Sequence, residues 1–263
     1  MNKCVHAARP ARRRLDALLV DMGLVETRTK AHALIMAGKV IVDGTVVDKP
    51  GKEIKEGICV ELKEGMPYVG RGGVKLAGAL DEFNIAVKGL VAMDVGSSTG
   101  GFTDCLLKRG AAFVYAVDVG KGILDYKLRN DARVCVLEER NIRGLEFSEV
   151  GRKVDIIVVD VSFISLEKAL PNVREFVKDD GAVLALIKPQ FEVGKGEVGK
   201  GGIVKDPKKH CAVVERITAF SVSAGFKFIS TCPSPITGAK GNKEFWIYLK
   251  NRDEAVTVNR DRK

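Results

Sequence analysis

The sequence has few of the side chains on which metal sites and catalytic triads depend. Only three histidines occur among 263 residues, and the six cysteines are scattered, with no Cys-x-x-Cys pair. A structural zinc site needs several such ligands at short spacing, and a Ser-His-Asp triad needs a histidine beside its nucleophile. We therefore expect reduced cysteines, no metal site and no triad.

Long apolar runs are also missing. None approaches the roughly 18 residues of a membrane-spanning helix. The basic start MNKCVHAARPARRR leads only into LDALLV, which is too short for the core of a signal peptide. These features predict a cytoplasmic protein that does not bind membranes. Lys and Arg total 43 against 34 Asp and Glu, a net charge of +9, and this excess favours a polyanionic partner such as nucleic acid.

The first 62 residues contain the pattern of a small module of their own. Apolar residues recur at helical spacing between Leu15 and Met22, and a second helix is expected from Thr27 to Gly38. Apolar residues then recur at every second position, as in β-strands. The stretches KVIV and TVV flank a DG turn, which predicts a hairpin, and ICVEL predicts a further strand. The sequence therefore predicts a small α+β domain with two helices and a short sheet.

Basic side chains are concentrated at the expected exposed positions of this module. A charge run alone is usually a solvated face. The stretch RTKAHALIMAGKVIVDGTVVDKPGKEIKEG, however, resembles the S4 RNA-binding domain over nearly the whole module. The resemblance implies that residues 1–63 form an S4-like domain whose basic face holds RNA phosphates, with binding that weakens as salt rises. The candidate RNA-binding residues are Arg12, Arg13, Arg14, Arg28, Lys30, His32 and Lys39.

A second domain follows the glycine-rich stretch EGMPYVGRGG at 64–73, which is expected to be a linker. Between residues 74 and 250, apolar strands alternate with helical segments, which predicts an α/β domain with a mostly parallel seven-stranded sheet covered on both faces. The last two strands leave no room for a helix between them, so one of the two is expected to run antiparallel. Residues 251–263 read as a polar tail. Strands are expected near 91–95, 113–117, 134–137, 154–159, 182–187, 226–232 and 244–249, and helices near 74–83, 101–109, 165–177 and 208–223.

The stretch DVGSSTGGFTD at 94–104 lies between the first of these strands and a helix, where a ligand-binding turn is expected. A phosphate-binding P-loop would need lysine in place of Phe102, and a dinucleotide turn would need glycine in place of Ser98. A literal G-x-G-x-x-G begins at Gly194, but no strand and helix flank it closely. The remaining pattern resembles the S-adenosylmethionine loop of Rossmann-like methyltransferases.

This resemblance implies roles for several polar residues at strand ends. Asp94 would face the methionine amino group, and Asp118, after the next strand, would accept hydrogen bonds from both ribose hydroxyls. Glu138 or Asn141 would lie near the adenine. Polar groups at the carboxyl ends of successive parallel strands meet at one edge of an open sheet, where such folds bind ligands. The turn itself would contact the cofactor through Gly96, Ser97, Ser98, Thr99, Gly100 and Gly101.

Three kinds of methyl acceptor are consistent with this fold. Amine-methylating enzymes carry a [DN]-P-P-[YF] turn after the fourth strand, where this chain has DVSF starting at Asp160. Carbon methylation needs a cysteine nucleophile, and Cys232 in STCPSP has no evident partner base. A hydroxyl acceptor is favoured by Lys75, Asp160, Lys188 and Glu244, three of which lie at strand edges.

The same four residues match the Lys-Asp-Lys-Glu tetrad of the FtsJ-like 2'-O-methyltransferases. Together with the S4-like module, residues 12 to about 250 resemble the TlyA family, also called hemolysin A, through VGRGGVKL, DVGSSTGGFTD, DVSFISL and KPQFE. The resemblance implies a Rossmann-like enzyme that uses S-adenosyl-L-methionine to methylate a cytidine ribose in ribosomal RNA within ribosomal subunits. Lys188 would be the base that deprotonates the 2'-hydroxyl. The alternatives are a non-catalytic ribosome-binding protein and a membrane-acting hemolysin.

Overall fold

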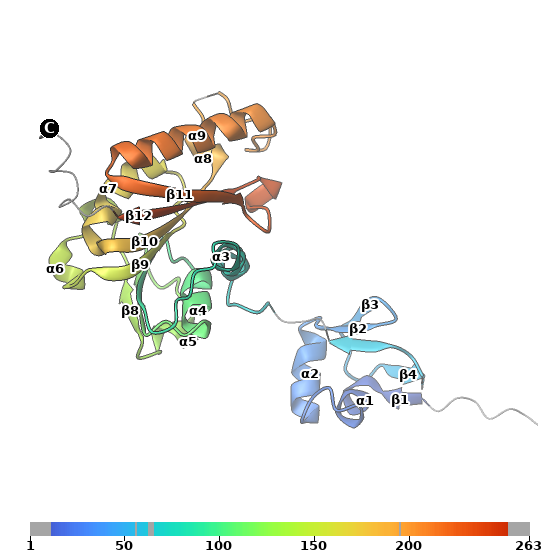
Figure 1. Ribbon diagram of the computed structural model, residues 1–263. Helices are drawn as coiled ribbons and strands as arrows, with labels where there is room; N and C mark the ends of the chain where they lie inside the picture. The colour runs from blue at the N-terminus through green and yellow to red at the C-terminus, as the bar shows by residue number, and fades with distance from the viewer. Residues whose placement is uncertain (1–11, 56, 63–65, 195, 252–263) are drawn as a thin grey trace, which may run out of the picture. The chain divides into compact units, whose positions relative to one another are not determined.

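The computed structural model describes residues 12–55, 57–62, 66–194 and 196–251. The chain divides into two compact units, residues 1–67 and 68–263, which are described separately (Figure 1). The larger unit begins within the stretch expected to be a linker, because Tyr68 and Val69 pack against its apolar core. The start of the expected S4-like domain, before Arg12, and the tail after Asn251 lie outside the described residues.

The small unit has the α+β pattern expected from its sequence. Thr27 caps α2 by accepting a hydrogen bond from the backbone N–H of Lys30. Strand β2 pairs antiparallel with β3 and β5, which confirms the predicted hairpin. The pair β1–β4 is not predicted by the sequence, because three-residue strands rich in charge carry no apolar alternation. Its described elements are β1 (Arg12–Arg14), α1 (Leu15–Asp21), α2 (Arg28–Met36), β2 (Val40–Val42), β3 (Thr45–Val47), β4 (Glu53–Lys55) and β5 (Val60–Leu62).

The larger unit is built around a seven-stranded sheet, in the order β11-β12-β10-β9-β6-β7-β8 over the described residues. All neighbouring strands are parallel except that β12 runs antiparallel to both β10 and β11. The mostly parallel sheet and the single reversed strand near its end are thus confirmed. The strands are β6 (Val91–Val95), β7 (Phe113–Val117), β8 (Val134–Leu137), β9 (Val154–Val159), β10 (Val177–Ile187), β11 (Phe226–Pro233) and β12 (Phe245–Asn251).

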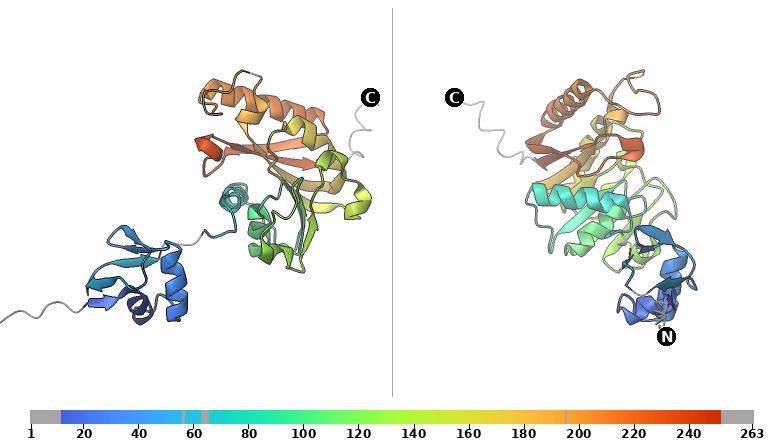
Figure 2. Two further views of the ribbon diagram at one scale, coloured as in Figure 1. Left: turned by 180° about the vertical axis from the view of Figure 1, so that it is seen from behind. Right: turned by 90° about the vertical axis from the view of Figure 1, so that its right-hand side faces the viewer.

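Helices cover both faces of this sheet (Figures 1 and 2). Helices α3 and α4 pack in one apolar cluster with Ile156 and Val158 of β9, whereas α7 and α9 pack in the other with Ile157 and Val159. The four long helices are confirmed, but α5, α6 and α8 have too few turns to show a period. The helices are α3 (Arg71–Glu82), α4 (Gly101–Lys108), α5 (Tyr126–Arg129), α6 (Phe147–Val150), α7 (Leu166–Phe176), α8 (Pro189–Glu192) and α9 (Pro207–Ser223).

Strand β12 extends to Asn251, so this residue belongs to the sheet and not to the expected tail. Its buried side chain accepts a hydrogen bond from Arg174 Nε and donates one to the carbonyl of Val177. Among the described residues, none of the helices combines the length and the apolarity needed to cross a membrane.

The order of the strands creates one position where connections leave the sheet in opposite directions. Strand β6 lies between β7 and β9, so its carboxyl end and that of β9 open a gap in the sheet edge. Gly96 follows β6 with φ +87°, and a Cβ there would lie 2.4 Å from the carbonyl oxygen of Asp160, which follows β9. Only glycine fits this close approach.

Candidate active site

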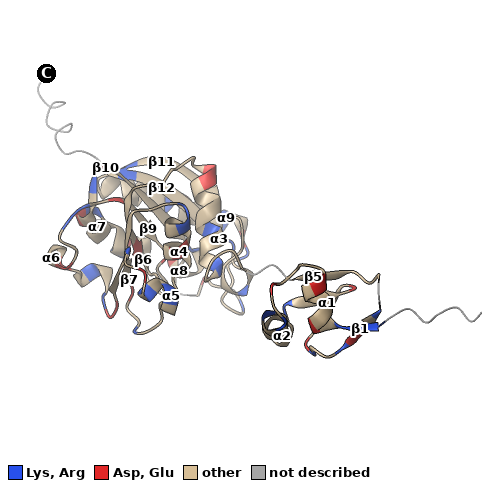
Figure 3. Cartoon of the chain, turned by 90° about the horizontal axis from the view of Figure 1, so that it is seen from below, with Lys and Arg blue, Asp and Glu red and all other residues tan. Residues whose placement is uncertain are grey.

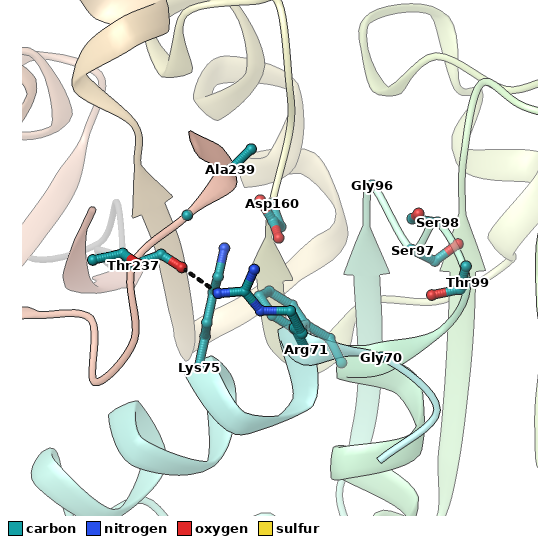
Figure 4. Close-up of a pocket in the computed structure, with 14 residues that line it drawn as sticks. Gly70, Arg71, Lys75, Gly96, Ser97, Ser98, Thr99, Asp160, Thr237 and Ala239 are labelled. Atoms are coloured by element: carbon teal, nitrogen blue, oxygen red, sulfur yellow. Dashed lines mark hydrogen bonds between the residues drawn. The ribbon is translucent and has the colours of Figure 1, made fainter. Parts of the chain in front are cut away.

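A cavity of about 230 Å³ lies at this gap in the sheet edge. Its wall is formed by the glycine turn after β6, the first turns of α3, Asp160, and the segment 237–239 before β12. Figure 4 shows Arg71 and Lys75 of α3 on one side, the serines of the glycine turn on the other, and Asp160 between them. Residues from four separate parts of the sequence therefore meet in one cavity.

The glycines of VGRGGVKL allow the start of α3 to lie directly on the glycine turn. A Cβ on Gly70 would lie 2.9 Å from Thr99 Oγ1, and one on Gly101 would lie 2.9 Å from the backbone nitrogen of Gly73. Arg71 then donates a hydrogen bond to the carbonyl of Thr237 across the cavity, at 2.9 Å. The sequence pattern predicts a linker here and does not mark Arg71 or Thr237 as site residues. The density of glycines is nevertheless a signal that segments of backbone pack closely.

Asp94 has the surroundings expected of a carboxylate that binds a cation. It is fully buried, and its Oδ2 accepts hydrogen bonds from the backbone N–H and the hydroxyl of Thr103, at 2.9 and 2.7 Å. Its Oδ1 is buried with no hydrogen-bond partner in the described part of the chain. Burial above all, together with the nearby charges of Asp160 and Asp118, raises the pKa of Asp94 to about 7. The ammonium of a bound S-adenosylmethionine would satisfy this orphaned oxygen, so the site fits the cofactor.

Asp118 lies beside the glycine turn, as expected for a residue that contacts a cofactor ribose. Its Oδ2 accepts a hydrogen bond from the backbone N–H of Ser98 at 2.8 Å, and its Oδ1 accepts one from Gly120 at 2.7 Å. The carboxylate thus holds the turn in shape.

The two residues expected near the adenine both accept hydrogen bonds from the backbone. Glu138 accepts hydrogen bonds from the N–H of Gly122 and from Arg129, and the bond from Gly122 above all lowers its pKa to about 2. Asn141 caps the 3-10 turn at Ile142–Gly144 by accepting from the N–H of Arg143. Neither side chain is part of the wall of the 230 Å³ cavity, so their contact with adenine stays a prediction.

The four expected tetrad residues form two ion pairs. Lys188 Nζ lies 2.5 Å from Asp160 Oδ1 and donates a hydrogen bond to Ser162 Oγ at 2.9 Å. Lys75 Nζ donates to Glu244 Oε2 at 2.6 Å. Both lysines and Glu244 are less than a tenth exposed, and Lys75 and Asp160 line the same cavity. The structure therefore brings all four residues to the carboxyl edge of the sheet.

The burial of these pairs explains why the residues occur together. A buried ammonium is costly unless a carboxylate and hydrogen bonds compensate for its lost hydration. Glu244 is enclosed so closely that a Cβ on Gly238 would lie 1.8 Å from its Oε1. Lys188 follows β10 and directly precedes Pro189, the first residue of α8, and its ammonium lies 5.8 Å from the centre of the Phe191 ring. Both pairs are therefore enclosed by neighbouring parts of the chain.

Comparison with known proteins identifies the family. A model of FtsJ-like methyltransferases matches residues 68–251, and a model of the S4 domain matches residues 13–57. The 16S/23S rRNA (cytidine-2'-O)-methyltransferase TlyA of Mycobacterium tuberculosis is 44% identical over 250 residues, which cover 94% of this chain and 93% of that protein. The chain belongs to the TlyA family.

Two further similarities support this assignment. Hemolysin A of Brachyspira hyodysenteriae is 42% identical over 237 residues, covering 90% of this chain and 99% of that protein. A solved structure from Streptococcus thermophilus is 44% identical, with a TM-score of 0.71, over 94% of this chain and 90% of that one. As a TlyA-family protein, the chain combines an S4 domain with an FtsJ-like methyltransferase domain that uses S-adenosyl-L-methionine.

Cys232, the alternative nucleophile for carbon methylation, lies partly buried in β11 of the methyltransferase domain. Burial raises the pKa of its thiol to about 11, and the charge of Glu82 adds to this effect. Very little thiolate would exist at neutral pH. Cys232 is therefore poorly suited to act as a nucleophile.

The candidate RNA-binding residues all lie in the S4 domain, where blue basic and red acidic segments are interspersed (Figure 3). Buried Asp16 binds both Arg14 and Arg28, at 2.9 and 3.0 Å. The hydrogen bonds from Arg14 above all hold the pKa of this carboxyl well below its usual range. These two guanidinium groups therefore help to hold the domain together and carry less free charge than the sequence suggests.

Two more of these cations have acidic partners on the surface, Arg13 with Asp21 at 2.7 Å and Lys30 with Glu26 at 3.2 Å. Such exposed pairs are weak and can exchange for phosphate. The described residues include no ion-pair partner for the others, which are Arg12, His32 and Lys39.

Proposed function

We propose that this TlyA-family chain methylates the 2'-hydroxyl of a cytidine ribose in ribosomal RNA, with Lys188 as the base. The observation that carries the proposal is the pair of buried lysine–carboxylate contacts at the cavity beside the glycine turn. The activity named for the Mycobacterium tuberculosis relative, 16S/23S rRNA (cytidine-2'-O)-methylation, supports cytidine in the RNA of both ribosomal subunits as the substrate.

Bound S-adenosylmethionine would supply a methyl group on a positively charged sulfur. A ribose hydroxyl is a poor nucleophile near neutral pH, so its proton must leave as the oxygen attacks the methyl carbon in line. Lys188, as the neutral amine, would accept that proton while Asp160 and Ser162 hold its Nζ in place. The O–C bond forms as the C–S bond breaks with its electron pair left on sulfur, and the ammonium formed at Lys188 is stabilised by Asp160.

The second pair would act on the ribose and not on the proton. Lys75 and Glu244 present a donor and an acceptor fixed 2.6 Å apart, which suits hydrogen bonding to sugar hydroxyls. Holding the attacking oxygen in line with the methyl carbon supplies much of the rate of such a transfer.

Methyl-labelled cofactor and purified ribosomal subunits test this function directly. We expect the label in alkali-resistant dinucleotides that contain cytidine, because a 2'-O-methyl group blocks the attack by which alkali cleaves RNA. Label in the mononucleotides that alkali releases would place the methyl group on a base and contradict the proposal.

Phe163 carries a ring near Lys188, because its centre lies 4.9 Å from that of the Phe191 ring, which in turn lies 5.8 Å from Lys188 Nζ. Phe163 is 91% exposed, adopts φ +63°, and lies three residues after Asp160. An exposed ring in a strained position suits stacking on an unpaired base. Phe163→Ala should raise KM for ribosomal subunits by about tenfold, with the Kd for the cofactor unchanged, and Phe163→Tyr should behave as the wild type. An equal loss of cofactor affinity would mean that the ring supports the cofactor site instead.

The free cations of the S4 domain should dominate the salt dependence of RNA binding. Changing Arg12 and Lys39 together to alanine should reduce the slope of log Kd against log salt by about 1.5 to 2, because two phosphate contacts are lost. Changing Arg13 and Lys30 together to alanine is the matched control and should change the slope less, since these two cations have to leave Asp21 and Glu26 before they bind phosphate. Filter-retention measurements of RNA binding from roughly 50 to 300 mM salt, where the phosphate contribution to affinity is large, test both variants. Equal slopes for the two variants would reject this division of roles.

A further inference from the structure

A second cavity, of about 470 Å³, lies beyond Glu244, between the start of α9 and the connection from β11 to β12. We call it the rim cavity. Its volume falls in the range of roughly 300–1,000 Å³ that is usual for sites taking small organic ligands. The lining residues that bear on its chemistry are Pro207, Cys211, Pro235, Ile236, Lys243 and Phe245.

The rim cavity is adjacent to the candidate active site. Thr237 lines both cavities. Glu244 lines the rim cavity, while its carboxylate binds Lys75, which lines the cavity beside the glycine turn. An RNA strand that presents a ribose to this ion pair would therefore have its next nucleotide at the rim cavity.

The wall formed by residues 233–237 is held in place before any ligand binds. The backbone N–H of Ser234 donates to the carbonyl of Glu244 at 2.9 Å, and its hydroxyl donates to the carbonyl of Ile236 at 2.8 Å. Pro235 packs on α3 so closely that a Cβ on Gly78 would lie 2.7 Å from its ring. A preformed wall lowers the entropic cost of binding.

The chemistry of the cavity fits a nucleobase that carries a phosphate. Proline rings, Ile236 and Phe245 offer apolar contact surface. Lys243 is exposed at the same cavity and has no ion-pair partner among the residues that the structure describes. Flat apolar surface beside a cation is the combination by which proteins hold single-stranded nucleic acid. The cofactor would not compete for this space, because its predicted contacts lie at the other cavity: the glycine turn lines that cavity, and Asp118 binds Ser98 of the turn.

We propose that the rim cavity receives the base of the nucleotide adjacent to the methylated one, with Lys243 on the phosphate that joins them. The proposal rests on the proposed function. It makes the recognised unit an RNA segment of at least two nucleotides.

Alkylation of Cys211 in the wild-type protein tests the occupancy of the cavity, because this exposed thiol is part of its lining. A pentamer of cytidylate should slow the reaction of Cys211 with iodoacetamide severalfold. The same pentamer without the two bases next to the central cytidine should not slow it. Exposed Cys59 in the S4 domain reports any general shielding by the RNA. Equal slowing by both pentamers, or slowing by neither, would overturn the proposal.

Filling the cavity gives a second, independent measurement. Cys211→Trp should raise KM for ribosomal subunits about tenfold without changing the Kd for the cofactor, and Cys211→Ser should match the wild type. An unchanged KM in the tryptophan variant would overturn the proposal while leaving the methyl transfer itself intact. A wild-type protein that transfers no methyl group to ribose would instead refute the proposed function, and the alkylation result would still report on the cavity.

Discussion

Lys188→Ala should lower the rate of methyl transfer by about 10²–10⁴-fold, the range typical of a lost general base. The Kd for S-adenosylmethionine should stay near its wild-type value, because Lys188 binds Asp160 and Ser162 and not the glycine turn. Single-turnover transfer of labelled methyl to ribosomal subunits and calorimetric binding of the cofactor measure the two quantities separately.

Lys188→Arg separates proton transfer from charge. Arginine keeps a cation beside Asp160, but its guanidinium does not accept a proton near neutral pH. If Lys188 is the base, the arginine variant should be about as inactive as the alanine variant. Substantial activity in the arginine variant would show that Lys188 serves only as a charge, and the assignment of the base would fail.

Asp94→Asn should weaken cofactor binding by about 10–100-fold, because the orphaned Oδ1 is the acceptor expected for the methionine ammonium. The affinity of the wild-type protein should also depend on pH. The pKa of Asp94 is raised to about 7 in the cofactor-free protein, and only the ionised carboxylate pairs with an ammonium. Wild-type affinity should therefore fall roughly tenfold between pH 7.5 and pH 6, and the asparagine variant should lose this dependence.

The same substitution should stabilise the protein without cofactor at alkaline pH. Since folding raises the pKa of Asp94, the folded state keeps a proton that the unfolded chain loses, and stability falls as pH rises from about 4 through 7. Asp94→Asn removes that penalty. The variant should be more stable than the wild type by about 1–3 kcal/mol at pH 8, with little difference at pH 4.5. Thermal or urea unfolding at the two pH values measures this.

Asp81→Asn is a matched control on the neighbouring helix α3, since Asp81 is exposed and pairs with Arg109. It should change neither the cofactor affinity nor its pH dependence. A wild-type affinity that stays constant from pH 6 to pH 7.5 would show that Asp94 is already ionised without the cofactor.

Much of the larger unit can be predicted from local pattern. The apolar strands from Val91 to Val95 and from Val154 to Val159 begin and end where the sequence places them, because each is a continuous apolar run between polar turns. The tetrad can also be identified from the sequence. Its members stand at the ends of predicted elements and match the tetrad of a known family; they are Lys75, Asp160, Lys188 and Glu244. Their roles in catalysis remain predictions, which the Lys188 variants address.

Features that depend on contact between distant segments could not be predicted. Arg14 and Arg28 look like free cations in the sequence, but both bind Asp16, which is buried by the packing of the S4 domain. The hydrogen bond by which Glu138 holds the backbone at Gly122 likewise cannot be read from the sequence. In each case a side chain has several plausible partners, and only the folded chain selects among them.

The sequence by itself determined the family, the order of strands and helices, and the residues that can carry methyl transfer, because apolar period and motif spacing are local properties. Only the tertiary structure decided how those residues pair. It set Lys188 against Asp160 and Lys75 against Glu244, left Asp94 Oδ1 without a hydrogen-bond partner among the described residues, and opened the rim cavity beside the second pair. Burial is the physical reason, since removing charges from water makes each one require a specific partner, and that partner comes from elsewhere in the chain.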